Sequence, residues 1–214
     1  MRYLPFLFLL PLALRPGGFE TGVERYFEGN YQKAVKIFRQ SCAQGVAAGC
    51  GYLGLMYEEG EGVESDKDRA LKLYLKACEM GSGEHCTALG FKYEVGADVP
   101  QDRQYALYLY GKACDGGDAR GCTALGNLYS EEGSPGSDIH RAAHFFRRSC
   151  DFGDAEGCFR LGKMYETGTG VRKDKSQAVQ YFGKACDGGE EQGCSHYARL
   201  HKESDLEALL SSYE

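Results

Sequence analysis

Apolar and polar residues follow a helical period along nearly the whole chain. Over residues 47–59, Leu53, Met56 and Tyr57 occupy positions i, i+3 and i+4, which predicts a helix with one apolar face. Gly60 follows directly, and glycine commonly ends a helix because it adopts the left-handed conformation without a steric cost. We therefore expect a helix over residues 47–59, called helix A of the repeat below.

A second helix, helix B, is expected a few residues later. Asp66 is suited to be its N-cap, because the carboxylate can accept from the free N–H groups of the first helical turn. Gly81 supplies the left-handed residue that stops this helix. The inner apolar stripe of helix B consists of Ala70, Leu73, Tyr74 and Ala77.

The same pattern returns every 36 residues. Five Cys-x7-Cys pairs carry the period: Cys42 and Cys50, Cys78 and Cys86, Cys114 and Cys122, Cys150 and Cys158, Cys186 and Cys194. Columns of small and aromatic residues share it, among them Gly54, Gly90, Gly126 and Gly162, and Phe38, Tyr74, Tyr110, Phe146 and Phe182. The small residues leave shallow grooves for the aromatic side chains of neighbouring helices. One helix pair cannot bury enough area alone, so the sequence predicts an all-α, α/α superhelical solenoid of 36-residue helix–turn–helix repeats.

The cysteine spacing indicates a disulfide bond within each pair. Because every repeat must solve the same geometry, we expect five local bridges, each stapling helix B of one repeat to helix A of the next. Zinc knuckles use closer Cys-x2-4-Cys spacing, and haem attachment uses Cys-x-x-Cys-His, so neither reading fits. Buried free thiols are the remaining alternative, and they would be unusual in an exported chain.

Two motifs resemble a known family. The run Leu-Gly-x-x-Tyr, Gly-x-Gly-Val, Asp, Ala, Tyr-x-x-Ala-Cys resembles the Sel1-like repeat, a relative of the tetratricopeptide repeat, and the added Cys-x7-Cys resembles the Helicobacter cysteine-rich proteins. The resemblance covers residues 19–200. Members of that family have been named penicillin-binding proteins or β-lactamases, so it implies β-lactam hydrolysis as an alternative function. The chain departs from the pattern at Glu132, His85, Ala198 and His201.

The two ends of the chain differ from the repeats. Residues 1–18 combine Arg2 with an apolar run that is long enough for a signal peptide and too short to span a bilayer. An uncleaved anchor is the alternative, and two prolines in the run count against it. We expect a secreted or periplasmic bacterial protein with no membrane span after signal removal. Residues 19–200 form the repeat array, and residues 201–214 read as a polar capping helix.

Charge and motifs narrow the functional classes. With 31 acidic and 25 basic residues, the chain has a net charge of −6 and should repel phosphate backbones, so nucleic acid is not an expected partner. The chain contains no Ser-x-x-Lys and no His-Glu-x-x-His, and every cysteine is assigned to a bridge, so no catalytic residue can be named. His140 and His144 share a helix face, but they lack an evident third ligand. We therefore expect no metal site, no cofactor and a monomer.

The shape of the predicted solenoid favours partner binding. Helix A of each repeat should line a concave face suited to an extended peptide or protein segment, with a β-lactam or a cell-wall-derived ligand as further candidates. Met56, Leu128 and Met164 are expected to be core residues instead. The candidate contacts lie five or six residues after the second cysteine of a pair: Leu55, Phe91, Lys92, Asn127 and Lys163. Asparagine can hold a peptide backbone and lysine a carboxylate.

Overall fold

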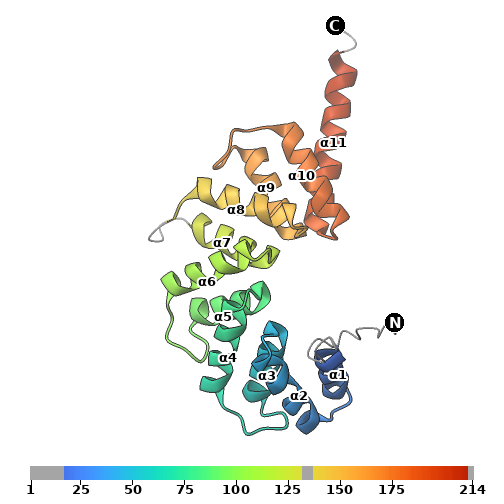
Figure 1. Ribbon diagram of the computed structural model, residues 1–214. Coiled ribbons are helices and arrows are strands. Elements are labelled where there is room, and N and C mark those ends of the chain that lie inside the picture. Colours follow the sequence, from blue (N-terminus) through green and yellow to red (C-terminus); the bar gives the residue numbers. More distant parts are fainter. Residues whose placement is uncertain (1–16, 132–136, 212–214) are drawn as a thin grey trace, which may run out of the picture. The chain divides into compact units, whose positions relative to one another are not determined.

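The computed structural model describes residues 17–131 and 137–211, with side chains described up to residue 203. These residues form eleven helices and no strand (Figure 1). The helices are α1 (Gly17–Phe27), α2 (Tyr31–Ala43), α3 (Ala47–Glu59), α4 (Lys67–Glu79), α5 (Gly83–Val95), α6 (Arg103–Asp115), α7 (Ala119–Ser130), α8 (Ile139–Asp151), α9 (Ala155–Thr167), α10 (Lys175–Asp187) and α11 (Glu191–Ser211). The helix predicted over residues 47–59 is α3, with the same bounds.

The chain divides into two compact units, residues 1–73 and 74–214, and the division falls within α4. In the first unit, α2 packs against both α1 and α3. Phe38 of α2 is fully buried there and stacks on Tyr52, with ring centroids 4.9 Å apart. Phe19 of α1 packs on both rings, which closes the apolar face of this first helix group.

In the second unit, helices α5 to α11 pack in chain order, each against the next (Figure 1). Helix α7 also contacts α5 and α9, so the A helices of successive repeats touch one another directly. The equivalent pairs of B helices, α6 with α8 and α8 with α10, make at most marginal contact. The A helices therefore form the inner row of this unit.

The helix boundaries follow from the repeated residues. Asp102, Asp138 and Asp174 are N-caps, and each side chain accepts a hydrogen bond from a backbone N–H in the first turn of its B helix. The glycines that end the B helices have φ between 85° and 92°, a region that strongly favours glycine; they are Gly45, Gly81, Gly117, Gly153 and Gly189. Both assignments agree with the sequence prediction.

The column of glycines in helix A gives room to an aromatic ring of helix B. A Cβ atom at Gly126 would lie 2.5 Å from a ring carbon of Phe146, and one at Gly90 would lie 2.8 Å from the ring of Tyr110. Gly162 stands in the same relation to Phe182. The predicted packing of small against aromatic columns is confirmed in the second unit, where it brings each helix pair to close range.

All five predicted disulfide bonds are present. Each joins the two cysteines of one Cys-x7-Cys pair, with Cα–Cα distances of 4.5–4.6 Å, and none of the ten cysteines is free. Each bridge crosses the turn between helix B of one repeat and helix A of the next. The structure thus confirms a disulfide-stapled α/α solenoid.

The departures at His85 and Glu132 and the predicted end of the repeat array lie in different surroundings. His85 stacks on Tyr74 and its Nδ1 lies 2.6 Å from the Ser82 hydroxyl, so the larger side chain is accommodated at a helix start. Glu132 lies outside the described residues, as does most of the predicted signal segment. The expected boundary between residues 200 and 201 falls inside α11, which continues through it without a break.

Candidate partner-binding groove

A groove of about 710 Å³ runs along the inner row of A helices in the second unit. Helices α5, α7 and α9 supply most of its wall, and Tyr110 of α6 contributes from behind. Its lining residues are Glu84, Thr87, Ala88, Phe91, Glu94, Tyr110, Arg120, Thr123, Ala124, Asn127, Asp154 and Glu156. Most of them occupy equivalent places in successive repeats, because the 36-residue period places each column along the same face.

Hydroxyl–carboxylate contacts hold neighbouring A helices at a fixed spacing. Thr87 Oγ1 of α5 donates to Asp118 Oδ2 at the start of α7, at 2.8 Å. One repeat later, Thr123 donates to Asp154 in the same way, and Ser149 Oγ also donates to Asp154 Oδ2 at 3.0 Å. The floor of the groove is therefore built by hydrogen bonds between repeats as well as by apolar packing.

The centre of the groove combines an apolar and an amide side chain. Phe91 is 56% exposed although most large apolar residues of the chain are buried. Asn127 is half-buried, and its side chain forms no hydrogen bond with another described residue, although its backbone oxygen accepts one from the Ser130 hydroxyl. These two residues occupy the same position in consecutive repeats, so they lie side by side on α5 and α7.

Carboxylates flank this centre. Glu94 Oε2 accepts a hydrogen bond of 2.5 Å from the Tyr110 hydroxyl. Burial, and next the hydrogen bond and charge of Glu94, raise the pKa of Tyr110 far above its ordinary value. The phenol therefore keeps its proton and continues to donate to Glu94 at all physiological pH values.

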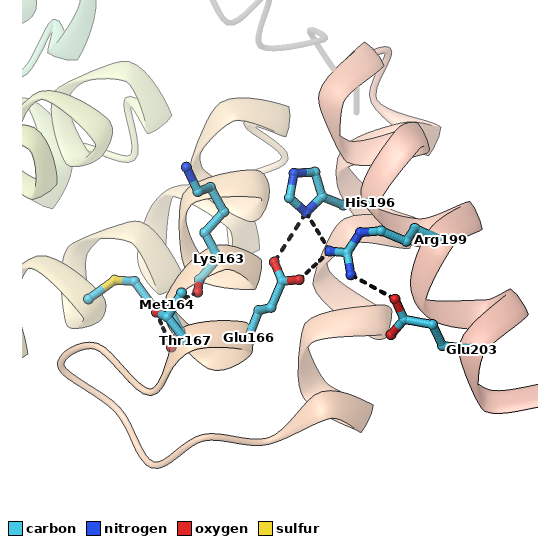
Figure 2. Close-up of polar contacts among 7 residues, drawn as sticks. All are labelled: Lys163, Met164, Glu166, Thr167, His196, Arg199 and Glu203. Carbon is cyan, nitrogen blue, oxygen red and sulfur yellow. Dashed lines mark hydrogen bonds and ion pairs between the residues drawn. The ribbon is translucent and has the colours of Figure 1, made fainter. Parts of the chain in front are cut away.

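A second polar cluster joins α11 to the last complete repeat (Figure 2). Glu166 of α9 accepts from Arg199 and lies 3.1 Å from His196 Nδ1, while Arg199 also pairs with Glu203 at 3.1 Å. Burial raises the pKa of the Glu166 carboxyl, but Arg199 and then His196 lower it by a larger amount, so that the pKa falls below its ordinary value. Lys175 Nζ lies 3.7 Å from Glu203, so two cations face the two carboxylates, which suits the attachment of α11 better than acid–base chemistry.

Comparisons with known proteins agree with this architecture. The family model described as the Sel1 repeat matches residues 18–46, 47–82, 86–118, 119–154 and 155–190. The chain belongs to the Sel1 repeat family. A Sel1 repeat protein of Oxalobacter formigenes has a similar structure, with a TM-score of 0.74 and 30% identity, over 85% of this chain and 74% of that one. A protective antigen of uropathogenic Escherichia coli gives a TM-score of 0.75 at 29% identity, over 87% of this chain and 41% of that one.

The Sel1 repeats of this chain also resemble the Helicobacter pylori cysteine-rich proteins. Cysteine-rich protein B is 33% identical with a TM-score of 0.50, over 62% of this chain and 96% of that one. HcpE, which carries a β-lactamase name, is 44% identical over 45 residues, and HcpD, named likewise, is 40% identical over 48. The matches span 21–22% of this chain and only 13–16% of these two relatives.

The five predicted contact residues of these Sel1 repeats do not lie together in the structure. Phe91 and Asn127 lie together in the groove. Lys92 instead extends toward Asp98, with Nζ 3.5 Å from Oδ2, because the following loop places that carboxylate beside it. Lys163 is exposed over the ring of Phe159, outside the groove lining, and its ammonium takes no part in the contacts of Figure 2. Leu55 belongs to the other unit and is half-buried on α3.

The groove also contains residues that the sequence reasoning missed. Thr87 and Thr123 each directly follow the second cysteine of a pair, and their carboxylate partners come 31 residues later. The same separation of threonine and aspartate occurs in two consecutive repeats. This repeated spacing could have indicated a contact between neighbouring repeats. Met56, Leu128 and Met164 are buried, as expected of core positions.

The two histidines considered as metal ligands have other contacts. His140 Nδ1 lies 2.8 Å from the Gly170 carbonyl oxygen, and the His144 ring packs edge-on against Phe145. In the part of the chain that the structure describes, no three histidine, cysteine or acidic residues gather in a way that could hold a metal ion. The helices between residues 17 and 211 include none that is both long and apolar enough to cross a bilayer.

Proposed function

We propose that this chain is an exported, disulfide-rich scaffold that binds an extended segment of a partner protein in the groove on α5, α7 and α9. The observation that carries this proposal is the pairing of an exposed aromatic ring with an unpartnered amide at the groove centre, at Phe91 and Asn127. Buried aromatic anchors dominate the binding energy of many interfaces. A side-chain amide has two donors and an acceptor, which match the groups of a peptide backbone.

The export part of the proposal rests on the cysteines and the N-terminal segment. Five disulfide bonds persist in an oxidising compartment such as the periplasm or the extracellular space. Expression with residues 1–18 should give oxidised protein outside the cytoplasm, whereas expression without them should give alkylatable thiols. Cell fractionation followed by thiol alkylation and mass spectrometry measures both outcomes, and full oxidation without the segment would contradict the reasoning.

The hydroxyl groups of the groove serve contacts between helices. Its two threonine hydroxyls donate to carboxylates, and none of the described lysines lines it. The β-lactamase name belongs to relatives that match over short segments, so we carry β-lactam hydrolysis only as a test in the Discussion.

Photo-crosslinking tests partner binding directly. A photoreactive phenylalanine at position 91 should trap a partner in the bacterium that makes the protein, whereas the same group at position 108 should not. Tyr108 is the matched control, because it is 55% exposed, as Phe91 is 56% exposed, but lies on α6 outside the groove lining. Equal trapping at both positions, or trapping at neither, would refute the groove assignment.

The trapped partner then allows affinities to be measured. Phe91→Ala should weaken binding by about 1–2 kcal/mol, since the half of the ring that is exposed would be buried in the complex. Asn127→Ala should weaken it by about 1–3 kcal/mol with an almost unchanged melting temperature. Tyr108→Ala should leave the affinity unchanged. A loss of stability with intact affinity would instead make Asn127 a structural residue.

A further inference from the structure

The groove has an excess of negative charge that its own residues do not neutralise. Four carboxylates line it against one guanidinium: Glu84, Glu94, Asp154 and Glu156 against Arg120. Lys92 and Lys163, two of the residues predicted to contact a partner, are turned to other contacts and do not line it. An anionic ligand would meet repulsion here, whereas a cationic one would be attracted.

Two of the carboxylates are bound only by hydroxyl groups. Glu94 accepts from Tyr110, and Asp154 accepts from Thr123 and Ser149; neither has an ion-pair partner among the described residues. Both side chains are half-buried, on α5 and at the start of α9, on either side of α7. Hydroxyl donors orient these carboxylates but leave their full charge in place, so each is held ready for a cation.

The other two carboxylates have weak and exposed partners. Glu84 lies 4.0 Å from Arg120, and both side chains are well exposed, at 71% and 65%. Glu156 pairs with Arg160 one turn along the same helix, where both are about half exposed. Ion pairs of this kind contribute little and exchange readily with a competing charge.

We propose that the occupant of the groove is an extended segment of a partner protein that carries lysine or arginine side chains on both sides of an apolar residue. Its basic side chains would reach Glu94 and Asp154, its apolar residue would cover Phe91, and Asn127 would bind its backbone. This inference rests on the proposed function and adds the chemical class of the partner. It also disfavours an anionic occupant such as the carboxylate of a β-lactam.

Selection from a random peptide library tests the charge of the occupant separately from the existence of the site. A phage library of random twelve-residue peptides is selected on the oxidised protein, and each selected peptide is tested again on the Phe91→Ala, Asn127→Ala double variant. We expect the peptides that lose binding to the double variant to be enriched in lysine and arginine. If those groove-dependent peptides are neutral or acidic, the charge inference fails and the groove remains a binding site. If no selected peptide depends on the groove, the proposed function fails as well.

The strongest groove-dependent peptide then tests the two oriented carboxylates. Glu94→Gln keeps an acceptor for Tyr110 while removing the charge, and Asp154→Asn does the same for its hydroxyl donors. Each should weaken binding of a basic peptide roughly threefold to tenfold at low salt, and the difference from wild type should shrink at high salt. Asp187→Asn is the control, since it makes the same charge change at an exposed position on α10. Equal effects of the control and the groove variants would overturn the inference.

Discussion

Replacing Gly126 by alanine tests how closely helices A and B must approach. An added Cβ would lie 2.5 Å, 2.6 Å and 2.9 Å from three ring carbons of Phe146, whereas ordinary carbon contacts are about 3.5–4.0 Å. The ring would have to withdraw by about 1 Å. It is 2% exposed and packs with Ala142, Leu161 and Met164, so little free space is within reach.

The expected cost follows from two opposing effects. Overpacking a core of this kind costs about 1–3 kcal/mol. Alanine in a helix gains about 1 kcal/mol over glycine. Because the clash involves a buried aromatic ring, we expect a net loss of about 1–2 kcal/mol in the free energy of unfolding.

Gly111 provides the matched control for this substitution. It also lies within a helix, α6, but a Cβ there would meet nothing within 4 Å. Gly111→Ala should therefore stabilise the protein by about 0.5–1 kcal/mol. Urea unfolding followed by circular dichroism measures both variants, and tyrosine fluorescence gives a second probe because the chain has no tryptophan. Equal stability of the two variants would refute the argument that the glycine column sets the helix spacing.

Three further predictions address the bridges, the α11 cluster and catalysis. Replacing Cys114 and Cys122 together by serine should lower the free energy of unfolding by about 2–3 kcal/mol according to the chain-entropy model. Hydrogen exchange should increase first in α6 and α7, and a uniform increase along the chain would contradict a stability that varies from repeat to repeat. Because the pKa of Glu166 is lowered on folding, its stabilising contribution should be present above the ordinary value of 4.5 and lost as the pH falls through the lowered pKa; Glu166→Gln should thus destabilise more at pH 7 than near pH 3 in urea unfolding, and an equal effect at both pH values would exclude this origin. Purified protein should not hydrolyse a chromogenic β-lactam, and turnover that follows the folded protein through chromatography and is lost on one point substitution would establish the alternative function.

The local features of the fold were predictable because each depends on few residues. Asp102 caps its helix by contacts within one turn, and the left-handed glycine at 117 needs only its own backbone freedom. The disulfide pairing followed from the 36-residue period, because equivalent cysteines in every repeat must pair in the same way. The period also placed Phe91 and Asn127 in one column, and both line the groove; that they contact a partner stays a prediction.

The electrostatic character of the groove was not predictable from the column positions. Lys92 lies one position after Phe91, and its direction depends on Asp98, which adopts a positive φ of 63° in the following loop. Such a loop conformation is not encoded by helical periodicity. The charges that matter, Glu94 and Asp154, come from different repeats and are brought together only by the stacking of helices. A sequence pattern can place a residue on one face of a helix, but it does not show which residues of neighbouring helices lie beside it.

The position of the five disulfide bonds has a consequence for resistance to proteolysis. Each bridge spans the short turn that links one repeat to the next, where the chain reverses through a left-handed glycine such as Gly117. A protease that cuts within such a turn leaves the two new ends tied through sulfur, so the repeats remain one molecule. The loops between helices A and B, such as residues 60–66, lie outside every bridged segment. Nicks in these loops are therefore the ones that would divide the chain into fragments with no covalent link between them.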